Sequence, residues 1–338
     1  MATSLPCSSL NEINKEERDE RIKMVEKSYQ RYREIISTLP NINGWIGEDM
    51  RLYEGFWYRT NHALEGVMCV QEHFKARSDD ILLISAPKSG TTWLKSLVFA
   101  IMKRACYTNS THPLLTTNPH DCVPCLELKL FKRSPVADVD DLPSPRIFST
   151  HIPYTSLPES ILYSGCKIVY ICRDPKDVLI SLRYFLAKSK PSTELPPLSF
   201  EEVFELFTKG ISSYGPIWDH VQGYHKASLE CPHRFFFITY EEMKRHTLVN
   251  VKRLAEFLEQ PFSMVEEREY AVEEIINLCS IDTLKKLEVN KSGLRNSYFP
   301  NDAFFRKGEI GDWRNHLTPQ MAESIDQITN EKLPGIFD

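Results

Sequence analysis

The sequence predicts a single α/β domain in which helices cover both faces of a mainly parallel β-sheet. Short, continuously apolar segments alternate along the chain with longer segments whose apolar residues recur at helical spacing, and this alternation is typical of parallel sheets. No stretch resembles a linker, although 338 residues would suffice for two domains of about 100–200 residues each. We therefore expect one core.

Residues 1–40 are expected to form a tail and an amphipathic helical extension, and residues 41–338 the main domain. Within the extension, apolar residues recur with gaps of 3, 4, 3 and 4 residues, at Ile22, Val25, Tyr29, Tyr32 and Ile36. This spacing places them on one stripe of a helix. Because two heptads are too few for a convincing coiled coil, we expect the stripe to pack against the chain's own domain.

The strands and helices follow in order along the rest of the chain. Four segments have the apolar character of buried strands, at 80–85, 145–150, 167–172 and 234–239. Helical periodicity predicts helices at about 91–104, 177–188, 200–212, 216–229, 241–258, 266–279 and 319–332. The Pro-rich stretch 190–198 is expected to be a surface loop, and 290–302 is rich in turn-forming residues.

The beginning of the chain and its cysteines favour the cytoplasm. The start has no apolar run and becomes acidic by Glu12, which is unlike a secretory signal peptide. No stretch of about 18 apolar residues could span a membrane. The nine cysteines are scattered and odd in number, which favours reduced thiols.

Charge restricts the binding partners. Lys and Arg number 41 against 46 Asp and Glu, so the net charge of −5 argues against a nucleic-acid partner or an anionic membrane surface. It leaves open a small polyanion bound by a local cluster of cations. Cys122 and Cys125 form a Cys-x-x-Cys pair, but Pro124 lies inside it and further ligands of suitable spacing are missing, so we expect no metal.

The segment SAPKSGTTW at 85–93 connects a predicted strand to a predicted helix. Such a loop presents unpaired backbone N–H groups at the positive end of a helix dipole, which favours an anion. Its side chains add one cation, three hydroxyl donors and a glycine that permits close approach: Lys88, Ser89, Gly90, Thr91 and Thr92. The loop is therefore predicted to bind phosphate.

The loop does not match the nucleoside-triphosphate pattern G-x-x-x-x-G-K-[ST]. When the pattern is aligned on Gly90, Ser85 stands in place of the first glycine and Thr91 in place of the lysine. The phosphate loop is accordingly expected to serve something other than an ATP–magnesium complex.

The segment PKSGTTW at 87–93 resembles the 5′-phosphosulfate loop of the cytosolic (soluble) sulfotransferases, which transfer a sulfuryl group from 3′-phosphoadenosine 5′-phosphosulfate (PAPS) to small acceptors. Further blocks occur in the order of that family: STHIP at 149–153, YICRDPKDVLIS at 170–181 and FFRKGEIGDW at 304–313. NPHDCVP at 118–124 and LEVNK at 287–291 resemble the plant branch. The resemblance covers about 44–333, most of the chain, and it implies an enzyme.

The resemblance implies roles for the reacting groups. His151 would be the base that takes the proton of the acceptor hydroxyl, at the end of a buried strand where ligand crevices open. Lys88 would neutralise the charge that develops on the leaving oxygen of adenosine 3′,5′-diphosphate (PAP). Ser181 and Arg173 match the family's 3′-phosphate binders, and Ser181 would also belong to the catalytic group. The reaction requires no metal.

The remaining cofactor contacts also follow from the resemblance. Arg306, Lys307 and Gly308 would close over the 3′-phosphate. The adenine would be contacted by aromatic residues and by a Ser-Ile pair that stands where the family usually has Ser-Phe: Trp93, Tyr240, Phe304, Ser280 and Ile281. Because Ile281 cannot stack as a phenylalanine does, cofactor affinity is expected to differ.

The expected acceptor is a small hydroxylated metabolite in an apolar, aromatic pocket. It would be a flavonoid or other phenol, a hydroxylated hormone, a steroid-like alcohol or a desulfoglucosinolate. Position within the family suggests as pocket residues Tyr53, Phe56, Trp57, His120, Pro124, Cys125, Pro153 and Phe185. Cys125 replaces a frequent aromatic and should leave more room. For His120, a structural role in the core or as a helix cap is about as good an interpretation as a role in the acceptor pocket.

The sequence leaves alternatives open for the oligomeric state and for the activity. Thr318-Pro319 stands where animal relatives carry the Thr-Val pair of their dimerisation motif, so a monomer or a weak homodimer is expected. A catalytically idle ligand-binding relative is an alternative, motivated by Ile281. An atypical P-loop phosphotransferase is a further one, opposed by the failed glycine spacing.

Overall fold

The computed structural model describes residues 15–108, 110–131, 139–140, 142–189, 196–295 and 298–337. The side chains of 15–19, 21, 22, 61 and 62 lie outside the described set, and so does most of the predicted loop at 190–198.

The central sheet has four parallel strands, as the sequence predicts. They are β4 (Ile81–Ile84), β5 (Ile147–Thr150), β6 (Lys167–Cys172) and β7 (Phe235–Thr239), in the order β5-β4-β6-β7. Ile84 pairs with Thr150 on one side and with Tyr170 on the other, so the neighbouring strands end at the same edge. The β4 strand is buried at every residue, because helices cover both of its faces.

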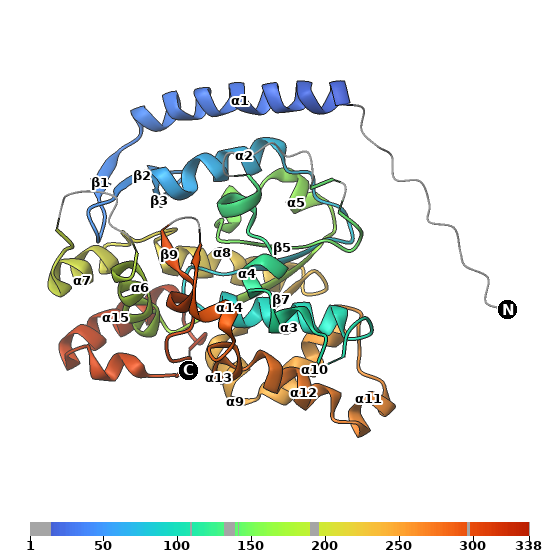
Figure 1. Ribbon diagram of the computed structural model, residues 1–338. Helices are drawn as coiled ribbons and strands as arrows, with labels where there is room; N and C mark the ends of the chain where they lie inside the picture. Colours follow the sequence, from blue (N-terminus) through green and yellow to red (C-terminus); the bar gives the residue numbers. More distant parts are fainter. Residues whose placement is uncertain are drawn as a thin grey trace.

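Alternate residues of the strands pack into two separate apolar clusters. Leu83 and Val169 point into a cluster formed with α3 (Thr91–Lys103), α10 (Thr247–Phe257) and α12 (Ala271–Cys279). Leu82 and Ile168 point into a larger cluster on the opposite face. Its helices are α2 (Glu65–His73), α5 (Glu159–Tyr163), α6 (Pro175–Ala187), α7 (Phe200–Thr208), α8 (Ile217–Glu230) and α15 (Pro319–Lys332). In Figure 1, α2 lies above the sheet, and α10 and α12 lie below it.

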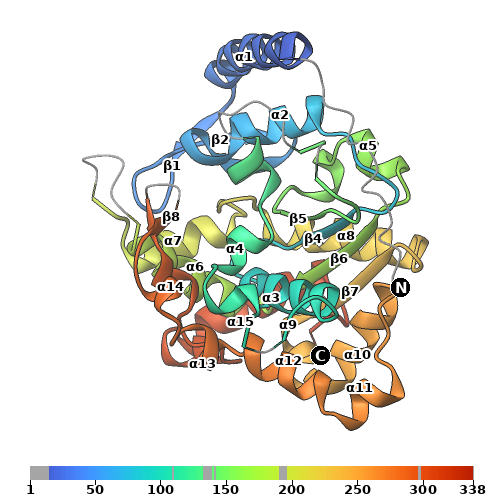
Figure 2. The same ribbon diagram turned by 45° about the vertical axis from the view of Figure 1, so that its right-hand side comes forward.

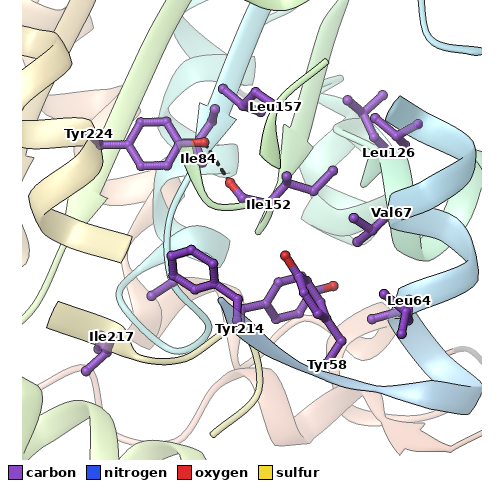
Figure 3. Close-up of a cluster of buried hydrophobic side chains, with 14 of the residues drawn as sticks. Tyr58, Leu64, Val67, Ile84, Leu126, Ile152, Leu157, Tyr214, Ile217 and Tyr224 are labelled. Atoms are coloured by element: carbon purple, nitrogen blue, oxygen red, sulfur yellow. Dashed lines mark hydrogen bonds between the residues drawn. The ribbon is translucent and has the colours of Figure 1, made fainter. Parts of the chain in front are cut away.

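Figure 3 shows part of the larger cluster, which holds several tyrosines. The rings of Tyr58 and Tyr214 meet edge to face at 5.4 Å, and the hydroxyl of Tyr224 donates to the Ile152 carbonyl oxygen at 2.7 Å. A buried tyrosine normally finds such a partner for its hydroxyl. The hydrogen bond holds the segment after β5 against α8, and the ring contact holds β3 (Phe56–Arg59) against the segment before α8.

The amphipathic extension is the helix α1 (Lys15–Thr38), and it lies on the outer side of α2 in both views (Figures 1 and 2). The four stripe residues with described side chains are buried: Val25, Tyr29, Tyr32 and Ile36. Tyr32 also donates to Glu72 on α2 at 2.7 Å. The expected packing against the chain's own domain is therefore confirmed for these residues, while the domain boundary at residue 40 stays a prediction.

Several elements differ from the sequence-based expectation. The predicted helix 241–258 is divided into α9 (Tyr240–Arg245) and α10, because His246 adopts a non-helical conformation with φ −124° and ψ 47°. The predicted helix 266–279 is divided into α11 (Met264–Arg268) and α12 at Tyr270, which has φ +59°. Neither break has a proline or glycine to mark it in the sequence.

The remaining short elements were not predicted. An antiparallel sheet comprises β1 (Asn41–Asn43), β2 (Asp49–Tyr53) and β3 (Phe56–Arg59). The turn-rich segment contains α13 (Ile281–Leu284), α14 (Glu288–Lys291), the hairpin of β8 (Leu294–Arg295) and β9 (Phe299–Pro300), and η6 (Asn301–Phe304). Short helical turns complete the chain: η1 (Thr60–Leu64), η2 (Pro113–Leu115), α4 (Pro119–Cys122), η3 (Leu126–Leu130), η5 (Tyr154–Ser156) and η7 (Asp312–Asn315). None of the helices in the described ranges is long and apolar enough to cross a bilayer.

Candidate active site

The site lies at the carboxyl edge of the parallel sheet, where side chains that follow each strand meet. Ser85 follows β4, His151 follows β5, Arg173 follows β6 and Tyr240 follows β7. In an open α/β sheet this edge is where ligands bind. The sheet order therefore brings together residues that are up to 155 positions apart (240 − 85 = 155).

One cavity at this edge is lined by most of the residues that the sequence singles out. They are Lys88, Gly90, Thr91, Thr92, Trp93, His151, Arg173, Ser181, Tyr240, Ile281, Phe304, Arg306, Lys307 and Gly308. Ser89 and Ser280 do not line it. Ser89 is fully buried and its hydroxyl has no partner, whereas Ser280 caps α13 by accepting a hydrogen bond from the Thr283 N–H at 3.1 Å.

The phosphate loop is shaped by two residues with positive φ. Lys88 has φ +69° and Gly90 has φ +111°. A Cβ atom on Gly90 would lie 2.8 Å from the ring of Tyr240, so only glycine fits between the loop and that ring. Below the loop, Ser85 Oγ lies 2.6 Å from Thr91 Oγ1, which ties the strand end to the first turn of α3.

His151 is held by groups on its ring and on its backbone. Its Nδ1 lies 2.7 Å from the Ser85 carbonyl oxygen, and a carbonyl can only accept, so the proton is on Nδ1 and Nε2 carries the lone pair. Its backbone N–H donates to Glu127 Oε1 at 2.8 Å. Burial lowers the pKa of His151, and the nearby Lys95 and Lys88 also lower it, against Glu127 and Ser85. The imidazole is therefore neutral at pH 7 and can take a proton.

Lys88 projects toward two aromatic rings and lies in a cationic region. Its Nζ lies 4.1 Å from the ring centroid of Phe185 and 5.6 Å from that of Phe304. Burial lowers the pKa of Lys88 to about 7, with further contributions from the charges of Arg173 and Arg306. A negatively charged ligand beside Lys88 would reverse this effect by favouring the ammonium form.

Asp177 links Arg173 to the segment 311–313. This buried carboxylate lies 3.2 Å from Arg173 Nη2 and accepts from the Gly311 and Trp313 N–H groups at 2.7 and 3.0 Å. Because one carboxylate holds both, the cation that follows β6 and the segment 311–313 keep a fixed relation.

Asp312 holds the two cations that close the cavity. Its buried side chain accepts from Arg306 Nη1 at 2.5 Å and from Lys307 Nζ at 2.6 Å. Although burial opposes ionisation, hydrogen bonds from Lys307 and Arg306 hold the pKa of Asp312 well below its usual range. Asp312 was not among the predicted site residues.

An aromatic and aliphatic wall forms the end of the cavity beyond the phosphate loop. The rings of Trp93 and Tyr240 meet edge to face at 5.5 Å, and the Tyr240 hydroxyl donates to the Gly308 carbonyl oxygen at 2.8 Å. Gly308 has φ +69°, and a Cβ atom there would lie 2.7 Å from Ile281 Cδ1. Ile281 therefore packs against the backbone of the closing segment.

Three of the eight predicted acceptor residues line the cavity. His120, Cys125 and Phe185 line the cavity, whereas Tyr53, Phe56, Trp57, Pro124 and Pro153 are not among its lining residues. His120 is neutral, because burial lowers its pKa well below the usual value. Its ring lies 4.4 Å from that of Phe304, and its Nε2 lies 3.0 Å from Thr92 Oγ1.

Sequence reasoning missed further polar residues of the site. Arg59, Lys95, Lys129, Tyr214 and Arg295 line the cavity without belonging to a recognised motif. One signal was available for Lys95, since it interrupts an otherwise apolar helix, but no pattern distinguishes it from a surface lysine. Glu127 lies behind His151 in an irregular π-helical turn that periodicity does not reveal.

Comparisons with known proteins show which family the chain belongs to. The family model for the sulfotransferase domain matches residues 78–337. Cytosolic sulfotransferase 17 of Arabidopsis thaliana is 46% identical over 315 residues, which cover 92% of this chain and 90% of the relative. A flavonol sulfotransferase-like protein of Flaveria bidentis is 46% identical over 307 residues, covering 89% and 97%.

Two solved structures are similar along most of the chain. A putative steroid sulphotransferase of Arabidopsis thaliana superposes with a TM-score of 0.71 at 39% identity, covering 92% of this chain and 95% of that one. A mouse sulfotransferase complexed with PAP superposes with a TM-score of 0.65 at 28% identity, covering 85% and 94%. The chain therefore belongs to the sulfotransferase family, as a plant-type member. It is an enzyme that transfers sulfate from PAPS to a small-molecule acceptor.

The cavity contains polar groups suited to a ligand of this kind. Among the buried side chains that the structure describes, Arg173 Nε and Arg306 Nε have no hydrogen-bond partner. Buried polar atoms are normally paired, so both atoms suit an anion in the cavity. The glycines at 90 and 308 permit close approach of that anion to the backbone.

Proposed function

We propose that this chain transfers the sulfuryl group of PAPS to a hydroxyl of a small metabolite and releases PAP, with His151 as the base and Lys88 stabilising the leaving oxygen. The observation that carries the proposal is the hydrogen bond of 2.7 Å between His151 Nδ1 and the Ser85 carbonyl oxygen. It leaves the basic Nε2 for an acceptor hydroxyl, in a cavity that Lys88 also lines.

The chemistry assigned to the side chains is as follows. His151 Nε2 takes the proton of the acceptor hydroxyl while the acceptor oxygen forms its bond to sulfur. Lys88 donates to the bridging oxygen of the 5′-phosphate as the bond between that oxygen and sulfur breaks, so that the electron pair remains on PAP. This loose, in-line transfer resembles phosphoryl transfer, in which positioning and charge stabilisation supply most of the catalysis.

The other residues are assigned to binding of the donor. Ser89, Gly90, Thr91 and Thr92 would hold the 5′-phosphosulfate at the N-terminus of α3. The 3′-phosphate would be bound by a second group, comprising Arg173, Ser181, Arg306, Lys307 and Gly308. Trp93, Tyr240, Phe304 and Ile281 would contact adenine, with Ser280 supporting Ile281 from the cap of α13.

The acceptor class, compartment and assembly are further parts of the proposal. The relatives include a flavonol sulfotransferase-like protein and a putative steroid sulphotransferase, which supports a hydroxylated acceptor with an apolar skeleton. The names of the Arabidopsis relatives support work in the cytosol. We infer a monomer or a weak homodimer.

The test is transfer of labelled sulfate from PAPS to a panel of phenols, flavonols, steroid-like alcohols, hydroxylated hormones and desulfoglucosinolates. We expect labelled product from at least one acceptor and micromolar-range binding of PAP by calorimetry. Binding of PAP without transfer to any acceptor would favour a catalytically idle relative. Absence of both would contradict the proposal, and transfer from ATP with magnesium would indicate a phosphotransferase instead.

A further inference from the structure

The cavity carries more positive charge than the proposed donor site uses. Its lining residues include no Asp or Glu but eight cations: Arg59, Lys88, Lys95, Lys129, Arg173, Arg295, Arg306 and Lys307. Four of these are assigned to PAPS. The other four, Arg59, Lys95, Lys129 and Arg295, remain to be explained.

Arg59 has its own carboxylate. Its Nε lies 3.5 Å from Glu48 Oε1, and both side chains are buried. Burial lowers the pKa of Arg59, and Glu48 opposes that effect. This pair is neutral as a whole, so the surplus charge must come from the other three cations.

Lys95 is a buried ammonium group without a counter-ion among the residues that the structure describes. Its exposed fraction is 1%, and its Nζ lies 3.1 Å from His120 Nδ1, its one recorded hydrogen-bond partner. An ammonium can only donate, so Nδ1 accepts and His120 Nε2–H faces Thr92 Oγ1. Burial lowers the pKa of Lys95 to about 8, which leaves it mostly charged at pH 7.

The nearby acidic groups that the structure describes form no ion pair or hydrogen bond with Lys95, although the charge of Glu127 acts on its pKa. Glu127 already accepts from Thr150 Oγ1, from the His151 N–H and from the Tyr214 hydroxyl, at 2.8, 2.8 and 3.2 Å. Burial raises the pKa of Cys125 well above its usual value, so it is a neutral thiol. A buried ammonium group without a direct carboxylate partner is costly, which makes an anion beside Lys95 favourable.

Arg295 presents a second unused donor on the same side. Its two terminal nitrogens form a bidentate pair with Asp121 at 3.2 and 2.7 Å, and Lys129 donates to the same carboxylate at 2.6 Å. Its buried Nε has no partner. Lys95, Lys129 and Arg295 against Asp121 and Glu127 leave one positive charge (3 − 2 = +1). The group therefore matches a single negative charge.

The group is distinct from the donor cations, since Arg295 and Lys129 act on the pKa of Lys95, whereas Arg173 and Arg306 act on that of Lys88. Hydrogen bonds link Lys95 through His120 to Thr92. The backbone of Cys125 forms an isolated parallel β-bridge with Ser149, two residues before His151. His151 is close to both sets, because the charges of Lys95 and of Lys88 both act on its pKa. The neighbouring lining residues Leu128, Leu182 and Leu186 are apolar.

We propose that Lys95 and Arg295 bind a carboxylate on the acceptor, so that the acceptor is a hydroxylated monocarboxylic acid with an apolar skeleton. The inference rests on the proposed function, since it concerns the molecule that receives the sulfuryl group. A singly charged carboxylate matches the single surplus charge, and Lys95 Nζ and Arg295 Nε are the donors with free capacity.

The test compares hydroxylated carboxylic acids with their methyl esters on aromatic, alicyclic and straight-chain skeletons. With the wild-type enzyme we expect kcat/KM for an acid to exceed that of its ester by about 10- to 100-fold, the range for hydrogen bonds to charged groups. Lys95→Met should abolish that preference, so that the ratio of kcat/KM for the acid to kcat/KM for its ester falls to about one, whatever happens to the ester rate itself. Arg295→Met should reduce the preference and serves as the second variant should Lys95→Met fail to fold. Lys103→Met, on the same helix but not lining the cavity, should match the wild type.

Binding of PAP by calorimetry separates this inference from the proposed function. Equal turnover of acids and esters, turnover of neutral acceptors alone, or an equal loss for acid and ester in both variants would overturn the inference while PAP binding and transfer stand. Loss of PAP binding together with all transfer by the wild type would overturn both.

Discussion

His151 Nδ1 lies 2.7 Å from the carbonyl oxygen of Ser85, the first residue after β4, so the strand that begins the phosphate loop also orients the imidazole that follows β5. The carbonyl fixes the tautomer, and the parallel register of β4 and β5 fixes the position. The proposed base and the predicted phosphate loop, which are 66 residues apart in the chain, are in this way placed in one cavity.

The profile of kcat/KM for PAPS against pH should be bell-shaped, with its acidic and basic limbs close together in pH. His151 must be neutral, so activity is lost as the pH falls below its lowered pKa. Lys88 must be protonated, so activity falls as the pH rises through about 7 in the free enzyme. In Lys88→Arg the fall should disappear, because a guanidinium stays charged, although the rate itself should be lower. Initial rates between pH 5 and pH 9 at subsaturating PAPS provide the measurement, and a wild-type profile that stays flat above pH 7 would speak against the assignment.

Glu127 is expected to position His151. Its carboxylate accepts hydrogen bonds from the His151 N–H and from the Thr150 hydroxyl, and its charge raises the pKa of the imidazole. Glu127→Gln should therefore lower kcat by about tenfold, the loss of about 1.5 kcal/mol typical of one hydrogen bond to a charged group. It should also move the acidic limb of the pH profile to lower pH, which a general loss of stability would not do. An acidic limb at its wild-type position would contradict this role. Glu288→Gln, on an exposed ion pair with Lys291, is the matched control.

Gly90 is expected to tolerate no side chain. Its φ is +111°, and a Cβ atom would lie 2.8 Å from the Tyr240 ring. Gly90→Ala should weaken PAP binding by at least tenfold, because the loop or the ring must move. Gly165→Ala is a sharp control, since Gly165 has φ +82° but nothing within 4 Å of an added Cβ atom. Both variants should lose about 1–2 kcal/mol of stability from backbone strain, and only Gly90→Ala should lose PAP affinity. Equal PAP affinities in calorimetry would contradict the steric account.

The sequence was sufficient for the sheet and for the strand–loop–helix segment at 81–103, because both depend on local patterns. Four apolar runs predicted the four parallel strands, and the blocks at 87–93, 170–181 and 304–313 do supply residues to one cavity. The breaks at His246 and Tyr270 were not predictable from periodicity, since apolar spacing continues through both. Tertiary packing decided these boundaries.

The polar surroundings of the site were harder to predict for a different reason. Glu127 and Lys95 act through partners 24 and 25 positions away, and nothing at their own positions distinguishes them from surface charges. Asp312 holds cations only six and five positions away, but the motif at 304–313 drew attention to those cations and not to the carboxylate. Ser280 is a different case: its motif predicts a ligand contact, whereas in the structure its hydroxyl caps α13 and does not line the cavity, so the contact stays a prediction. Three of the eight predicted acceptor residues, Tyr53, Phe56 and Trp57, lie in the β2–β3 hairpin and do not line the cavity. This small antiparallel sheet was not predicted from the sequence, so the positions of these residues could not be predicted either.

The central claim is that His151 takes the proton of the acceptor, and it is tested most directly by His151→Ala in the labelled-sulfate assay alongside PAP calorimetry. The account predicts a fall in kcat of about 10²- to 10⁴-fold, the usual contribution of a positioned base, with PAP affinity within a few-fold of wild type. A variant that keeps more than about a tenth of the wild-type kcat would contradict it, because the lost group could then supply no more than about 1.4 kcal/mol.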